Sequence, residues 1–259
     1  MPIKQEEEKS QTLEALSPAA QEILESILPL GTDLYFEATG LRCQPPNAQD
    51  LYALCTVLSK DPPEEELQTF LIQRPGFLMG LFGMNDAGDL ALIAKPKIGT
   101  KYVADFAIVQ VSQGGAGVRL IEIETAHEPI LTSALSPARR LQSALTQIDS
   151  WREWLGANKL TFCRDLIDRA CGLVLYDGVQ TSNSGYRFGD QTRLRQMWES
   201  FGGAADPVVQ YAVILGRWGL LNLEEKKRFI SKFGKSDDPA VFTFDQLARQ
   251  ANYRMDRAY

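Results

Sequence analysis

The segments VADFAIV (residues 103–109) and VRLIEIET (residues 118–125) decide the expected fold. Both are short apolar runs, and the sequence SQGGAG (residues 112–117) between them is rich in turn-forming residues. Two such runs joined by a glycine-containing turn predict a β-hairpin. The hairpin is the starting point for the rest of the chain, because each of its strands carries acidic residues where strands are usually depleted of them.

Asp105 interrupts the first strand, and Glu122 and Glu124 interrupt the second. Successive strand residues face opposite sides, so Glu122 and Glu124 share one face, roughly 6.6 Å apart along the strand. If Val111 pairs with Val118, Asp105 lies opposite Glu124. A register shifted by two residues places it opposite Glu122, and either register puts all three carboxylates on one face.

Two explanations fit these acids. An antiparallel hairpin with one face in water also alternates polar and apolar residues. Alternatively, the clustered carboxylates repel one another, and protonation or a hard cation such as Mg²⁺ or Mn²⁺ relieves the repulsion.

Two helices are expected on either side of the hairpin. Residues 135–156, LSPARRLQSALTQIDSWREWLG, have apolar residues at helical spacing, with Ser136 as N-cap and Gly156 as the stop. Gln147 would reach the carboxylates if this helix packs over the sheet, and is otherwise a polar flank residue. Residues 61–78, DPPEEELQTFLIQRPGFL, predict a helix over residues 64–73 between two prolines.

The order of these elements resembles the PD-(D/E)xK nuclease core and, more narrowly, the C-terminal nuclease domain of Shedu anti-phage defence proteins. The segments that carry the resemblance are EEELQTFLIQRPGFL (64–78), YVADFAIV (102–109), RLIEIETAHEPIL (119–131), ALTQIDSWREWL (144–155), YAVILGR (211–217) and VFTFDQLARQA (241–251). Each motif is short, and their order and spacing are more specific than any one of them.

The resemblance implies roles for particular residues. Asp105 matches the metal-binding aspartate, Glu122 matches the acid of the E-x-K motif, and Glu124 stands where that motif has lysine. Gln147 matches a glutamine found on the following helix of many such nucleases. Glu64 matches the acid of the first helix, with Glu66 as the alternative, although acids in a first turn also simply favour the helix dipole.

Glutamate at position 124 cannot stabilise negative charge on a phosphate as lysine does. It can bind a second metal ion or accept a proton. A lysine could come instead from Lys95, Lys97 or Lys101 beside the first strand, although each of these is expected to be a solvated strand-edge residue.

The resemblance therefore implies a metal-dependent DNA endonuclease that uses Mg²⁺ or Mn²⁺ in bacterial anti-phage defence, as a homo-oligomer for which a tetramer is one candidate. A catalytically inactive nucleic-acid-binding or regulatory protein on the same fold is the alternative. A third hypothesis is an interaction module that acts through the N-terminal part.

Composition limits these functions. The 259-residue chain has a net charge of −6 and a pI of about 5.0, which does not fit a strong sequence-independent DNA binder. Arg139 and Arg140 are either phosphate contacts or solvated residues.

One histidine and four scattered cysteines argue against histidine-based catalysis, zinc sites and a disulfide framework. No membrane-spanning run or signal peptide is found, so a cytoplasmic location is expected.

The predicted fold class is α/β, a restriction-endonuclease-like core with a mixed sheet flanked by helices. We expect a helical N-terminal accessory region over residues 1–60 and a nuclease-like domain over residues 61–259. Residues 160–210 are expected to be insertion-like within that domain.

Overall fold

A computed structural model describes residues 16–27, 43, 46–82, 89–112, 115–178, 181–202, 206–234 and 238–249. Parts of the predicted helical N-terminal region (residues 1–15, 28–42 and 44–45) and the centre of the predicted hairpin turn at 113–114 lie outside these ranges.

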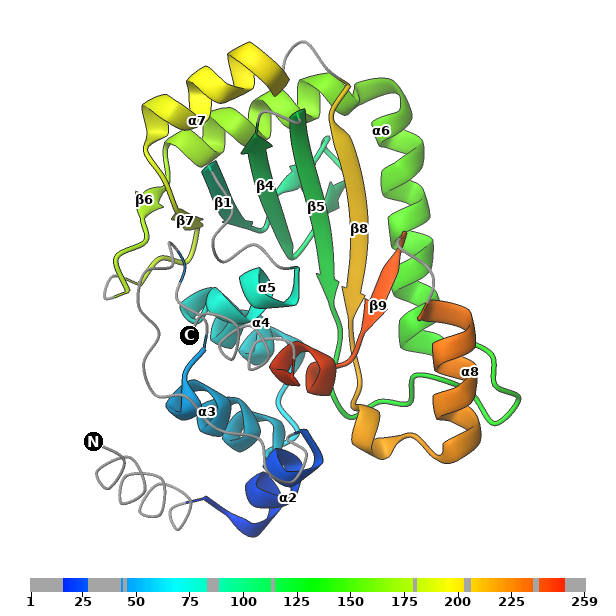
Figure 1. The fold of residues 1–259 in the computed structure, drawn as a ribbon. Helices are drawn as coiled ribbons and strands as arrows, with labels where there is room; N and C mark the ends of the chain where they lie inside the picture. The colour runs from blue at the N-terminus through cyan, green and yellow to red at the C-terminus, as the bar shows by residue number, and fades with distance from the viewer. Residues whose placement is uncertain are drawn as a thin grey trace, which may run out of the picture.

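A mixed seven-stranded sheet forms the centre of the molecule (Figure 1). Its strands, in spatial order, are β6 (Val174–Leu175), β7 (Gly185–Arg187), β1 (Asp89–Ala94), β4 (Phe106–Ser112), β5 (Gly115–Ile123), β8 (Val208–Ile214) and β9 (Ala240–Phe242). The pairs β1–β4 and β4–β5 are antiparallel, whereas β5–β8 and β8–β9 are parallel. A separate two-stranded hairpin consists of β2 (Lys97–Ile98) and β3 (Tyr102–Val103). The predicted α/β class with a mixed sheet is confirmed.

The β4–β5 register decides how the acids meet. Phe106 pairs with Ile121 and Val109 with Val118, so the same register continues to place Asp105 opposite Glu122. This is the second of the two registers expected from the sequence.

Helices cover both faces of the sheet (Figure 1). One face packs against α2 (Pro18–Ile27), α3 (Ala48–Leu58), α4 (Glu64–Gln73), α5 (Gly76–Leu81) and the helix at 244–249. The other face packs against α6 (Arg139–Cys171), α7 (Gln191–Met197), the π-helical η1 (Trp198–Gly202) and α8 (Leu223–Phe233), which follows the short 3-10 turn η2 (Trp218–Leu220).

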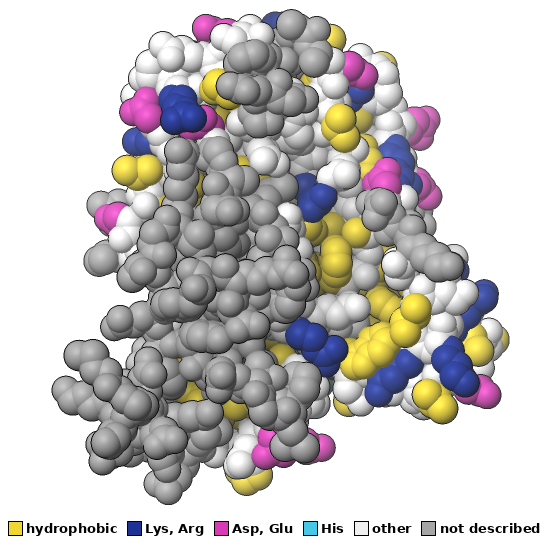
Figure 2. Space-filling view, in the orientation of Figure 1, with side chains coloured by type: hydrophobic (Ala, Val, Ile, Leu, Met, Phe, Trp, Pro, Cys, Tyr) yellow, Lys and Arg dark blue, Asp and Glu magenta, His cyan; other side chains and the backbone are white. Residues whose placement is uncertain are grey.

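The central strands β1, β4 and β5 therefore lie between two apolar layers, which explains their near-continuous apolar sequences. On the face with α4 and α5, apolar side chains still reach the surface over β5, β8 and β9 (Figure 2). The α2 and α3 helices share their apolar cluster with α4 and the sheet, so the described part of the N-terminal region packs directly on the core.

The helix α6 corrects two sequence predictions. It begins at Arg139 with Ala138 as N-cap, because the Ser136 hydroxyl lies 2.7 Å from the Thr132 hydroxyl instead of capping the helix. It also continues through Gly156 to Cys171, 33 residues in all. Gly156 is exposed, and the buried residues on both sides of it hold the helix together, so one unfavourable glycine does not end it.

Residues 160–210 contribute to the same sheet and layers. The second half of α6 packs on the sheet through Phe162, Leu166 and Ile167, and β7 pairs with β1. Within this stretch, the end of α6 is followed by β6 and β7, and then by α7 and η1.

Gly156→Ala should raise the free energy of unfolding by about 0.5–1 kcal/mol, because alanine restricts the unfolded chain and a Cβ at Gly156 meets no atom within 4 Å. Urea unfolding followed by circular dichroism measures this change. Gly185→Ala is the matched control: its φ is +112° and a Cβ would lie 2.0 Å from the Leu92 carbonyl oxygen, so the same substitution should destabilise. A destabilised Gly156→Ala protein would contradict a continuous α6.

Candidate active site

Three carboxylates are buried where β4 begins and β5 ends. Asp105 directly precedes β4, Glu122 is the second-last residue of β5, and Glu124 follows that strand. Their exposed fractions are 5%, 8% and 7%. These acids therefore do not belong to a solvated hairpin face, and the explanation that required water on that face is wrong.

Asp105 is held in place by three donors. The Ile123 backbone N–H donates to its Oδ2 at 2.6 Å, so the side chain of Asp105 takes a hydrogen bond from the partner strand β5. The Lys95 ammonium and the Gln68 amide both donate to Oδ1, at 2.6 and 2.8 Å. The aspartate therefore links the sheet, the turn after β1 and the helix α4.

The helix α4 brings a fourth acid to the site. Gln68 donates to Glu64 Oε1 at 2.7 Å with the same amide nitrogen that contacts Asp105. Glu64 is half-buried, whereas Glu65 and Glu66 are exposed. Of the two candidates in this helix, the structure brings Glu64 to the other acids. Glu64, Asp105, Glu122 and Glu124 are called the acid cluster below.

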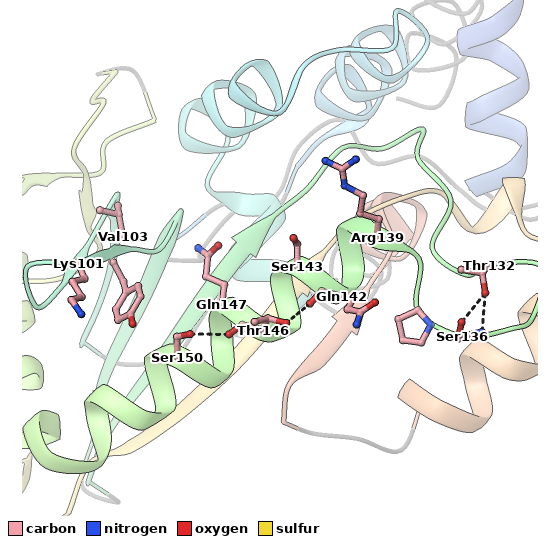
Figure 3. A pocket seen from close by; sticks show the side chains of 12 residues that line it. Lys101, Val103, Thr132, Ser136, Arg139, Gln142, Ser143, Thr146, Gln147 and Ser150 are labelled. Atoms are coloured by element: carbon pink, nitrogen blue, oxygen red, sulfur yellow. Dashed lines mark hydrogen bonds between the residues drawn. The ribbon is translucent and has the colours of Figure 1, made fainter.

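Gln147 reaches the acid cluster from the opposite layer. Its amide donates to Glu122 Oε1 at 2.9 Å, which is the contact expected if α6 packs over the sheet. Figure 3 shows Gln147 projecting from the same side of the helix as Ser143 and Arg139.

The two arginines at the start of α6 differ. Arg140 lies 3.6 Å from Glu124 Oε2 and 3.6 Å from Glu128 Oε1, so it bridges two acids. Arg139 is exposed and has no ion pair within the described part of the chain. Arg139 is therefore the more accessible of the two for a phosphate.

Lys95 is not the solvated strand-edge residue that the sequence predicts, because its ammonium donates to Asp105. Its φ of +48° is in the left-handed region, which lysine rarely adopts. Its N–H donates to the Asp105 carbonyl at 2.8 Å, and Arg169 of α6 donates to the Lys95 carbonyl at 3.2 Å and to the Ala94 carbonyl at 2.5 Å. These bonds hold a strained turn that places the ammonium on Asp105, while the side chain stays 53% exposed.

Burial and mutual repulsion make the acid cluster hard to ionise fully. Burial is the main cause that raises the pKa of Glu122 to about 9, and the charges of Asp105, Glu64 and Glu124 add to it. Burial also raises the pKa of Glu124 to about 7, with Arg140 opposing the rise. The pKa values of Glu64 and Asp105 are raised by burial too, and the Lys95 ammonium opposes both rises.

The donor set fits a hard divalent cation. Oxygen atoms of carboxylates are the ligands that Mg²⁺ and Mn²⁺ prefer. Glu122 Oε2 and Glu124 Oε2 are buried without a hydrogen-bond partner, a costly state that a cation would relieve. In this conformation, no three Asp, Glu, His or Cys side chains within the described ranges are arranged as a metal-binding group. Lys95 and the amides of Gln68 and Gln147 occupy other oxygens of the cluster.

The sequence analysis did not predict that Gln68 contacts Asp105 or that Arg169 holds the turn at Lys95. It predicted a solvated position for Lys95, whose ammonium instead contacts Asp105. Gln68 lies four residues after Glu64, so the helical spacing that puts both on one side of α4 was available as a signal. The position of Lys95 depends on a left-handed turn that its residue type does not indicate. Arg169 lies beyond Gly156, where the helix was expected to end.

The fold and the acid cluster define the class of protein: an α/β protein with a nuclease-like core, whose acids lie at the ends of two central strands. A family model described as Shedu protein SduA, C-terminal, matches residues 61–248, which is most of the chain. The chain therefore belongs to the Shedu SduA C-terminal family, which is associated with anti-phage defence. No curated protein matches the chain.

Of the helices that the structure describes, none combines the length and apolar character needed to cross a membrane.

Glu122→Gln should stabilise the protein in EDTA at pH 8 and have little effect at pH 5. The folded pKa of about 9 exceeds the ordinary value of 4.5, so the folded protein holds more protons than the unfolded chain between these values. Wild-type stability therefore falls as pH rises through this window, and a neutral side chain avoids that loss. The expected gain at pH 8 is roughly 1–2 kcal/mol, or about 2–8 °C in Tm.

Thermal unfolding from pH 5 to pH 9 measures this effect, with the exposed Glu153→Gln as the control for loss of one negative charge. If the advantage of Glu122→Gln over wild type does not grow with pH, Glu122 is not a raised-pKa residue in the folded protein.

Proposed function

We propose that the protein is a metal-dependent endonuclease that hydrolyses phosphodiester bonds in DNA as part of anti-phage defence. The observation that carries the proposal is the acid cluster, in which three buried carboxylates and the half-buried Glu64 converge and two carboxylate oxygens lack any hydrogen bond. Buried like charges are costly, and a site that retains them is a candidate for function.

Asp105 and Glu122 would hold Mg²⁺ or Mn²⁺. When bound, such an ion polarises the phosphate and lowers the pKa of a water molecule. The Ile123 N–H fixes the Asp105 carboxylate, and the Gln147 amide fixes that of Glu122. Both ligands are therefore oriented before any cation arrives, which reduces the cost of assembling the site.

Glu124 takes the proton of the attacking water. A pKa of about 7 suits a general base at neutral pH, and Arg140 keeps its carboxylate on the acid cluster. The water oxygen bonds to phosphorus, one phosphodiester P–O bond breaks, and the leaving oxygen takes a proton from solvent. In this scheme Glu124 can also act as a further cation ligand, because its Oε2 accepts no hydrogen bond.

Lys95 supplies the positive charge that the motif lysine provides in the resembling nucleases. Its ammonium lies on Asp105, yet about half of its side chain is exposed, so it can turn to a phosphate oxygen when the carboxylate gains another cation. This arrangement explains how glutamate can stand at position 124 without loss of the lysine's role.

Wild-type protein should cleave DNA with Mg²⁺ or Mn²⁺ and not with EDTA. Glu122→Gln should lower the rate by at least about 10²-fold, because it removes a charge from the cation site while keeping the side-chain shape. Linear and supercoiled DNA, with product formation followed on gels, provide the assay. Glu153→Gln is the matched control and should cleave as wild type does. Equal cleavage by Glu122→Gln would remove the acid cluster from the reaction.

Lys95→Ala should lower kcat by about 10²-fold with a smaller change in KM, because the ammonium acts on charge that develops during the reaction. Lys97→Ala removes a nearby exposed lysine of β2 and should leave both constants unchanged. Steady-state cleavage of a labelled duplex separates kcat from KM. A Lys95→Ala protein with wild-type kcat would show that this ammonium only neutralises Asp105.

The second candidate function is a non-catalytic nucleic-acid-binding or regulatory protein on the same fold. It is favoured by glutamate at the motif lysine position and by the lack, within the described residues, of a ready-made metal-binding group. A protein that binds DNA but does not cleave it with either metal would support this alternative. The homo-oligomer implied by the resemblance also stays a proposal, and sedimentation of the full chain measures it.

A further inference from the structure

A polar groove lies beside the acid cluster, between the β2–β3 hairpin and the first half of α6 (Figure 3). It has a volume of about 770 Å³. Lys101, Tyr102 and Val103 line one wall, and Arg139, Ser143 and Gln147 are among the residues of α6 that line the other.

The charge of the groove differs from that of the whole chain. Lys101 and Arg139 are its charged residues, and no Asp or Glu lines it, although the chain carries a net charge of −6. Both cations are exposed, and neither forms an ion pair with any described residue. A groove that offers hydroxyls, amides and two accessible cations fits an anion with many oxygen atoms.

The groove leads directly to the acid cluster. Arg139, Ser143 and Gln147 are four residues apart and so lie in one row along α6, about 12 Å from first to last. Figure 3 shows these three side chains on the same side of the helix. The row ends at Gln147, whose amide is 2.9 Å from Glu122 Oε1.

We infer that this groove holds the phosphodiester backbone of a nucleic-acid strand and delivers it to the acid cluster; the inference rests on the proposed nuclease function. Arginine, lysine, serine and glutamine are the side chains that contact phosphate oxygens in nucleic-acid complexes. Tyr102 and the 43%-exposed Val103 form the less polar wall, against which sugars or bases can lie. Lys101 and Arg139 bind phosphates from opposite walls.

The test measures binding separately from cleavage. Glu122→Gln serves as the slowly cleaving background. A labelled single-stranded oligonucleotide and the corresponding duplex are titrated by fluorescence anisotropy at several salt concentrations. Lys101→Ala/Arg139→Ala should weaken binding about tenfold or more. It should also reduce the slope of log K against log[salt] by about 2, one for each lost phosphate contact. Weakening for one probe only identifies the form of nucleic acid that the groove binds.

The control is Lys227→Ala/Lys232→Ala, which removes two exposed cations of α8 that do not line the groove. Equal affinity and slope for the groove variant and this control would overturn the inference. The proposed function can fail independently of this inference. If the protein with an intact acid cluster never cleaves DNA, but the groove variant still loses binding, the groove binds nucleic acid and the protein is not a nuclease. The opposite outcome uses Lys101→Ala/Arg139→Ala in a protein that keeps Glu122. If this protein cleaves and binds DNA as the control does, the nuclease function is supported and the groove inference is wrong.

Discussion

The hydrogen bond from the Ile123 backbone to the Asp105 carboxylate is the interaction on which the site depends. It joins the start of β4 to the end of β5 through a side chain, and it leaves Glu122 directly across from Asp105 in the observed register. Acidic side chains are thereby held together where β4 begins and β5 ends. Each neighbouring element then supplies a compensating group: Gln68 from α4, Lys95 from the turn after β1, and Gln147 and Arg140 from α6.

These compensating groups are incomplete, and the proposed chemistry depends on the oxygens that they leave without a hydrogen bond. The amides and the ammonium satisfy Asp105 and one oxygen of Glu122, while Oε2 of Glu122 and Oε2 of Glu124 have no hydrogen bond. The pKa of Glu122 rises to about 9 as a result of burial and repulsion. In the proposed function, a divalent cation would replace the proton of such a cluster and supply partners for the oxygens that lack hydrogen bonds.

The parts of the fold that follow from local patterns could be predicted from the sequence. The helix over residues 64–73 lies between prolines, and the acids stand out because apolar strands rarely contain them. The two possible registers were both consistent with the sequence, since strand pairing depends on a turn whose geometry the residues 112–117 do not settle. The continuation of α6 past Gly156 depends on packing against distant strands, and the placement of Lys95 depends on a strained turn held by Arg169. Tertiary contacts of this kind leave no local signal.

In the proposed function, a divalent cation takes the place of the internal donors at the acid cluster. Anomalous diffraction from crystals grown with Mn²⁺ tests it most directly. We expect one strong peak at the oxygens of Asp105 and Glu122, with the Lys95 ammonium moved off Asp105 towards solvent. Crystals that hold no Mn²⁺ at these acids, with Lys95 still bonded to Asp105, would contradict it.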